Sequence, residues 1–173
     1  CSKIDQSDIE NFLQMVFLDT LFTPEPEPFY SLKFSRPESY EQLKMQSQVI
    51  VAAINREGSN PGYHLMKNIL TNKQFHETQS NDPVILGKNI YAKKQLFMVI
   101  NARSLEHLNE FVGKKRNYIR KNFDIQFKER QNSFLFNKGN RNVISDSLKT
   151  EFGWSLDLPW GWDFIKKKPD SNF

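Results

Sequence analysis

QVIVAAIN, residues 48–55, and QLFMVIN, residues 95–101, are the two stretches that decide the fold class of this chain. Both are short apolar runs bounded by polar residues, a pattern typical of buried strands. A helix predicted over residues 63–75 separates them, so the two strands can pair in parallel through a right-handed crossover. We therefore expect an α+β fold, with a small mixed sheet, helices packed on one face and a C-terminal hairpin.

The first predicted helix runs from Ser7 to about Leu21. It begins with a capping box formed by Ser7 and Glu10, and its apolar residues follow at helical spacing. The run PEPEP, residues 24–28, ends this helix. Because alternating prolines favour polyproline II geometry, this run predicts a rigid, exposed connector.

Two more helices are predicted in the second half of the chain. Ser104 caps a long helix whose inner face carries Leu105, Leu108, Phe111, Val112 and Ile119. The other covers residues 142–152 and ends at Gly153, the residue type that favours a left-handed helix end.

The C-terminal segment predicts a hairpin. Apolar and polar residues alternate from Trp154 to Leu158, which indicates a half-buried strand with Trp154 in the core. Residues 158–161 fit a type I turn, and Trp162 begins the return strand. Trp160, at the turn, is expected to be exposed.

The length of 173 residues fits one domain. We expect an N-terminal tether over residues 1–6, a single α+β domain over residues 7–165, and a basic tail or connector over residues 166–173.

Charge is unevenly distributed along the chain. Residues 1–90 hold 8 Lys or Arg and 11 Asp or Glu, a net of −3, whereas residues 91–173 hold 16 and 9, a net of +7. The long helix carries a candidate basic face made of Lys114, Lys115, Arg116, Arg120 and Lys121. Such a face is typical of contacts with nucleic acid or anionic headgroups, and also of ordinary solvated helices. A basic nucleic-acid-binding module is therefore one alternative function.

The sequence contains no recognisable catalytic or cofactor motif. His64, His76 and His107 lack metal-ligand spacing, and the seven glycines form neither a P-loop nor a dinucleotide fingerprint. We expect no metal and no cofactor. An envelope hydrolase or glycan-binding enzyme, with a site assembled from distant residues, is another alternative function.

Cys1 is the only cysteine, so no intrachain disulfide is possible. A lone cysteine at the first position is typical of bacterial lipoproteins, whose cysteine sulfur carries a diacylglycerol. Two acyl chains are sufficient for stable attachment to a membrane. We expect a lipid on Cys1, followed by a short polar tether that begins with Ser2 and Lys3.

Several segments together carry a family resemblance. They are, in order, PEPEPF (24–29), QVIVAAIN (48–55), NIYAKKQL (89–96), KERQ (128–131) and GWSLDLPWGW (153–162). In this order they resemble the Bacteroidota envelope lipoprotein family of unknown function (domain of unknown function, number 4837), over roughly residues 9–173. The run N-x-Y-A-K-x-Q-L is the most specific part. The resemblance implies a lipoprotein of the cell envelope and brings no catalytic residues with it.

The chain departs from the family pattern at both ends. Family members usually begin with a strand before the first helix and continue past the position of Phe173. A missing strand would leave an open sheet edge, which another chain could cover.

These observations favour a membrane-anchored lipoprotein that acts as a non-catalytic binding or structural subunit of an outer-membrane protein assembly, such as a secretion, insertion or uptake machine. Nucleic acid is then the wrong partner. Besides the open sheet edge, the candidate partner contacts are Pro24, Glu25, Pro26, Glu27, Pro28, Trp160 and Trp162.

The lipid on Cys1 can be tested on protein purified from its native host. We expect the intact mass, and fragmentation of the N-terminal peptide, to show a diacylglycerol adduct on the Cys1 sulfur. An unmodified thiol, or residues preceding Cys1, would contradict the prediction.

Overall fold

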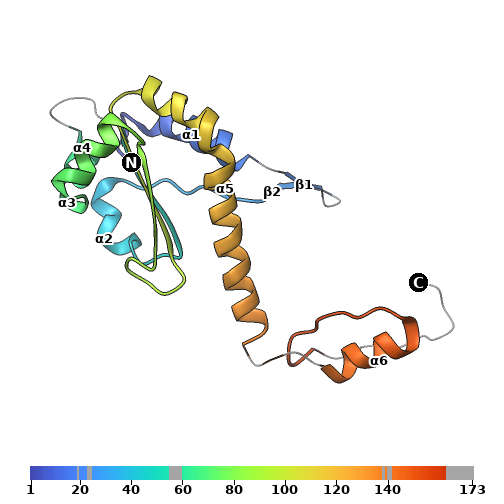
Figure 1. Ribbon diagram of the computed structural model, residues 1–173. Helices are drawn as coiled ribbons and strands as arrows, with labels where there is room; N and C mark the ends of the chain where they lie inside the picture. The colour runs from blue at the N-terminus through green and yellow to red at the C-terminus, as the bar shows by residue number, and fades with distance from the viewer. Residues whose placement is uncertain (19, 23–24, 55–59, 138, 140–141, 163–173) are drawn as a thin grey trace. The chain divides into compact units, whose positions relative to one another are not determined.

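The computed structural model describes residues 1–18, 20–22, 25–54, 60–137, 139 and 142–162. The chain divides into two compact units, Cys1–Gln126 and Phe127–Phe173 (Figure 1). This division differs from the single domain expected over residues 7–165. The predicted tail over residues 166–173 lies outside the described residues.

The first unit contains a three-stranded mixed sheet with the order β3-β5-β4. Strand β3 (Gln48–Ile54) pairs in parallel with β5 (Leu96–Ala102), which confirms the pairing expected from the two apolar runs. Strand β4 (Val84–Lys88) pairs antiparallel with β5. Strand β4 was not predicted from the sequence, and the antiparallel strands were expected in the C-terminal hairpin instead.

Helices cover both faces of this sheet. On one face, alternate residues such as Ala52 and Met98 pack against α1 (Gln6–Phe17) and α5 (Leu105–Leu135). On the other face, Val51 and Val99 pack with residues of α2 (Tyr40–Leu43), α3 (Pro61–Ile69) and α4 (Asn72–Ser80).

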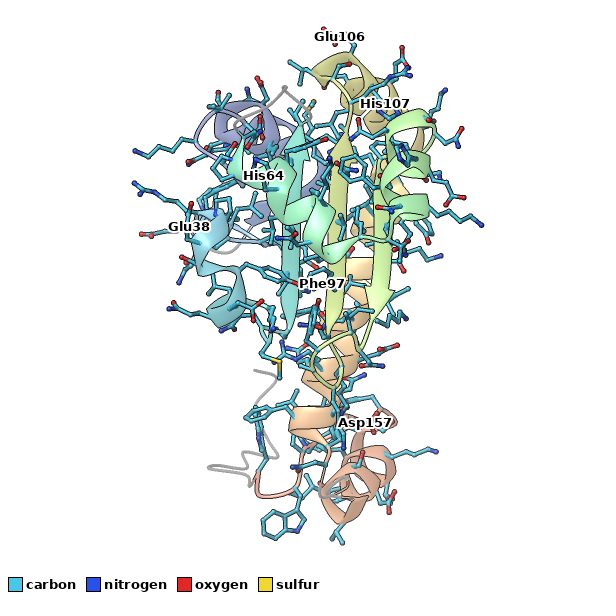
Figure 2. All side chains as sticks on the ribbon, turned by 90° about the vertical axis from the view of Figure 1, so that its left-hand side faces the viewer. Glu38, His64, Phe97, Glu106, His107 and Asp157 are labelled. Atoms are coloured by element: carbon cyan, nitrogen blue, oxygen red, sulfur yellow. The ribbon has the colours of Figure 1, made fainter. Side chains whose placement is uncertain are left out.

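Figures 1 and 2 show these two layers: Figure 1 places α3 and α4 on the opposite side of the sheet from α5, and in Figure 2 α3 lies in front of the strands. The α+β class is confirmed. The expectation that helices pack on one face is wrong, because strands that are apolar on both sides need a cover on both.

The N-terminus begins differently from the prediction. Ser2 and Asp5, assigned to a tether, are buried, and α1 starts at Gln6 with Asp5 at its N-cap. The predicted capping box is therefore wrong. The Asp5 carboxylate accepts hydrogen bonds from Ser2 Oγ (3.0 Å), Asn60 Nδ2 (2.6 Å) and the main-chain N–H of Ile54 (3.3 Å). Because the carboxylate joins the N-terminus to the end of β3, residues 1–6 belong to the folded unit.

Helix α1 ends at Phe17, several residues before the expected end. Strand β1 (Thr20–Phe22) follows and pairs antiparallel with β2 (Pro26–Pro28). The PEPEP run was predicted as a polyproline connector. Its described part, residues 25–28, is exposed as expected but forms one side of a small hairpin.

Two helices replace the one predicted over residues 63–75. Leu70 leaves the helical conformation after α3, and Thr71 then caps α4. The Thr71 hydroxyl accepts from the Gln74 N–H (3.3 Å), while the Gln74 side chain accepts from the Thr71 N–H (3.1 Å). This capping box is a T-x-x-Q pattern that was present in the sequence.

The beginning of α5 agrees with the prediction. The Ser104 hydroxyl accepts from the N–H of His107 (3.2 Å), as an N-cap does. The His107 ring is buried, and its two nitrogens contact Asn81 O (2.6 Å) and the Arg103 N–H (3.4 Å). Nδ1 therefore accepts and Nε2 donates, so this histidine has a structural role.

In the second unit, α6 (Asn142–Phe152) ends at Gly153 with φ of 75°, as predicted. The predicted hairpin is wrong where it can be described, because residues 154–158 form no strand and Trp154 is 47% exposed. The turn covers residues 159–162, with the Trp162 N–H donating to Pro159 O (3.2 Å) and Gly161 at φ of 93°. A glycine at positive φ in the third turn position excludes the type I turn that was expected.

Candidate binding groove beside strand β3

A groove of about 570 Å³ runs along β3 in the first unit. This volume lies within the range typical of ligand-binding clefts. Residues 48–52 of β3 line the groove, and so does the segment 30–37, which leads into the 3₁₀ helix η1 (Pro37–Ser39). In Figure 2, the labelled Glu38 marks η1 on the β3 side of the sheet.

The groove is lined mainly by apolar side chains from both layers of the unit. Helix α1 contributes Ile9, Leu13 and Phe17, and α5 contributes Phe123. From the opposite layer, Tyr40, Leu43 and Leu65 reach the same groove. The groove therefore lies at the side of the sheet, where the two helical layers meet.

The segment 30–35 has an alternating pattern that positions it beside the core. Tyr30, Leu32 and Phe34 are partly buried against the α1–α5 layer, whereas Ser31, Lys33 and Ser35 are exposed. This alternation of apolar and polar residues is present in the sequence, but no element was predicted from it. It identifies a strand-like segment between β2 and η1.

Tyr30 is held in place by three contacts. Its hydroxyl donates to Asp124 Oδ1 (2.9 Å), and its ring packs edge-on against Phe17 (5.2 Å between centroids). The Arg120 guanidinium lies 4.8 Å from the ring centroid and also pairs with Asp124 (2.9 Å). Burial, together with the hydrogen bond to Asp124, raises the pKa of Tyr30 well above its usual range. The hydroxyl therefore remains a donor at physiological pH.

On the opposite layer, the Tyr40 hydroxyl donates to the Tyr91 hydroxyl (2.8 Å). Burial and this contact raise the pKa of Tyr40 above its usual range. Lys44 lies over the Tyr91 ring, 5.3 Å from its centroid. Both tyrosines with raised pKa values are thus used as hydrogen-bond donors within the fold.

The charges that line the groove are cationic. Lys33 and Arg36 are exposed and line it, and the Cys1 ammonium donates to Ser35 O (3.0 Å) at its border. Burial lowers the pKa of this ammonium. Among the described residues that line the groove there is no Asp or Glu.

The candidate site residues predicted from the sequence lie elsewhere, apart from Cys1, which lines the groove. Glu25, Pro26, Glu27 and Pro28 are exposed on the β1–β2 hairpin, and Pro24 lies outside the described residues. Trp160 and Trp162 are 57% and 58% exposed in the second unit, which agrees with the exposure expected of Trp160.

The predicted basic face is divided. Lys114, Arg116 and Lys121 are exposed. Lys115 forms an ion pair with Asp82, and the Arg120 side chain is only 17% exposed because it packs on Tyr30 and binds Asp124. Lys115 is exposed as expected, and the expectation of an outward side chain is wrong for Arg120 alone among the five.

Across the described ranges, no cluster of three or more His, Cys, Asp or Glu side chains could hold a metal ion. None of the helices in the described part combines the length and the apolar character required to cross a membrane. Comparisons with protein-family models, with curated proteins and with solved structures find no match to this chain. The family resemblance noted from the sequence stays a prediction.

The role assigned to Tyr30 predicts a specific pH dependence. Tyr30→Phe removes the bond to Asp124 and should lower the free energy of unfolding by about 1 kcal/mol at pH 7. Because the folded-state pKa of Tyr30 is raised, its contribution is fully present below the unfolded pKa of about 10 and is lost as pH rises above it. The difference between wild type and variant should therefore shrink between about pH 10 and pH 11.5 in urea unfolding.

Tyr118→Phe is the matched control, because the Tyr118 side chain is 57% exposed. It should leave stability at pH 7 unchanged. Parallel pH profiles for wild type and Tyr30→Phe would contradict the assigned role.

Proposed function

We propose that this chain is a membrane-anchored bacterial lipoprotein that acts as a non-catalytic binding subunit of an outer-membrane protein assembly. The observation that carries the proposal is the groove along β3. It combines an apolar lining with the side of an edge strand, and both are features of surfaces that bind other proteins.

The position of Cys1 supports the membrane part of the proposal. Cys1 lines the groove, its thiol-bearing side chain is partly exposed, and the next residue, Ser2, is buried. A lipid on the Cys1 sulfur would therefore leave directly from the folded unit, without a flexible tether. The groove would then be held close to the membrane surface, where the soluble part of an outer-membrane partner is found.

The exposed aromatic side chains of the second unit support a role in binding. Trp154, Trp160 and Trp162 are each about half exposed, and the rings of Phe152 and Trp154 are 6.3 Å apart. Trp residues are enriched at the energetic centres of protein interfaces. We assign them to a second contact with the assembly.

Photocrosslinking in the native host tests this function. A photoreactive benzoylphenylalanine at position 33, on the border of the groove, should form adducts with an outer-membrane protein. The matched control is position 73, an exposed lysine on α4. Position 73 should give no such adduct.

Cys1→Ser completes the test. It should release the protein from the membrane fraction and remove the adduct at position 33. Equal adducts from positions 33 and 73, or an adduct at position 33 that persists in the soluble fraction, would contradict the proposed function.

A further inference from the structure

Strand β3 has hydrogen-bonding groups available on its outer side. The N–H of Leu96 in β5 donates to Ser47 O (2.9 Å), so the odd-numbered residues of the parallel ladder direct their main-chain groups toward β5. The main-chain groups of Gln48, Ile50 and Ala52 consequently point away from the sheet. Within the described ranges, no main-chain hydrogen bond joins them to another segment.

Side chains bind the outward main-chain groups of β3 at the Ile54 end of the strand, but not along the rest of it. At one end, the outward N–H of Ile54 donates to Asp5 Oδ2 (3.3 Å). At the other end, the Gln48 side chain donates to Gln126 Oε1 (2.8 Å) and Gln126 donates to Ser47 O (3.2 Å), a group that faces β5. Within the described residues, these bonds leave the outward main-chain groups of Gln48 open. Ile50 and Ala52 lie between these ends, where the groove runs.

The far border of the groove offers main-chain groups as well. Within the described residues, the main-chain groups of residues 31–35 take part in a single hydrogen bond, which the Cys1 ammonium donates to Ser35 O. The groove thus lies beside an open strand and a strand-like segment that do not bond to each other.

We propose that the groove binds an extended segment of a partner protein as an additional strand beside β3. This inference rests on the proposed function and names the way in which the partner is held. A row of main-chain donors and acceptors spaced two residues apart matches another extended main chain. An acyl chain would leave the Ile50 and Ala52 groups without partners, which is costly in an apolar groove.

The lining of the groove determines the chemistry of the partner segment. Successive side chains of an added strand point to opposite faces, so one set meets Leu13 and Phe17 and the other set meets Tyr40 and Leu65. Both sets should be apolar. The cations Lys33 and Arg36 favour acidic residues where the segment leaves the groove. A segment of roughly five residues spans Gln48 to Ala52 at about 3.3 Å per residue.

The other edge of the sheet serves as an internal comparison. Strand β4 has five residues and ends in the exposed Lys88, and the smaller cavity beside it is lined by the Lys115–Asp82 ion pair. Short length and lysine are features that protect sheet edges from pairing. Leu86, whose main-chain groups point outward from β4, is therefore not a binding position.

The test uses a displayed library of random 12-residue peptides as the probe and the full chain as the target. Enriched peptides should carry an apolar core with acidic flanks. Two sets of alternate peptide residues can be N-methylated, the odd-numbered and the even-numbered. Methylation of one set should weaken binding at least tenfold, because the N–H groups of that set donate to β3. The amide resonances of Ile50 and Ala52 should shift on binding, whereas that of Leu86 should not.

Ile50→Pro is the matched protein variant. The N–H of Ile50 is not used in the β5 ladder, so proline at this position removes an outward donor and leaves the ladder intact. It should weaken binding of the enriched peptide at least tenfold, and Ile50→Val should not. If Ile50→Pro does not fold, the N-methylated peptides still test the inference, because they are measured against the wild-type chain.

Four results would overturn this inference. The library could yield no enriched peptide, or N-methylation could leave peptide affinity unchanged. The amide resonances of β4 could shift instead of those of β3, or the groove could bind palmitate and no peptide. The proposed function has its own readout, the adduct at position 33. An adduct formed without strand-like peptide binding would retain the function and reject this mode of binding.

Discussion

Strand β3 is covered on both faces but hydrogen-bonded along only one side, and this constraint shapes the first unit. Ala52 and Ile54 pack toward α1 and α5, and Val51 and Ala53 pack toward α3 and α4, so the strand cannot be exposed as an ordinary edge strand is. Its outer polar groups therefore face a groove between two apolar layers. Polar groups that face an apolar groove without partners are costly, so this edge is incomplete by itself in the described part of the unit.

Elsewhere in the unit, buried side chains form hydrogen bonds with neighbouring segments of the chain. Gln95 is 1% exposed and donates to both Lys44 O and Gln46 O (2.6 Å each), while its own oxygen accepts from the Tyr91 N–H (2.9 Å). Asn101 likewise donates to Thr78 Oγ1 (2.8 Å). These residues connect the ends of β5 to neighbouring segments. On the outer side of β3, Asp5 plays this part only at the Ile54 end of the strand.

The parts of the fold that were predicted correctly carry local signals: apolar runs for β3 and β5, and capping residues for α5 and α6. Strand β4 was missed because VILGK is short and ends in Gly-Lys, so its pairing depends on β5. The role of Asp5 could not be predicted from the local sequence, because its hydrogen-bond partners are as much as 55 residues away. The run NIYAKKQL, the most specific part of the family resemblance, forms the β4–β5 loop, where Asn89 and Lys94 take positive φ. Its distinctive residues have structural roles, so they carry no information about the partner.

We propose that this structural deficit has one function, in which a partner protein completes the open edge of β3 and a lipid on Cys1 holds the chain at a membrane. Hydrogen exchange of the free protein, resolved by residue, tests the deficit directly. The amides of Ile50 and Ala52 should exchange at least about tenfold faster than those of Val51 and Ala53, which donate to β5. Equal protection of all four amides would show that the outer side of β3 is already paired, and would contradict the account.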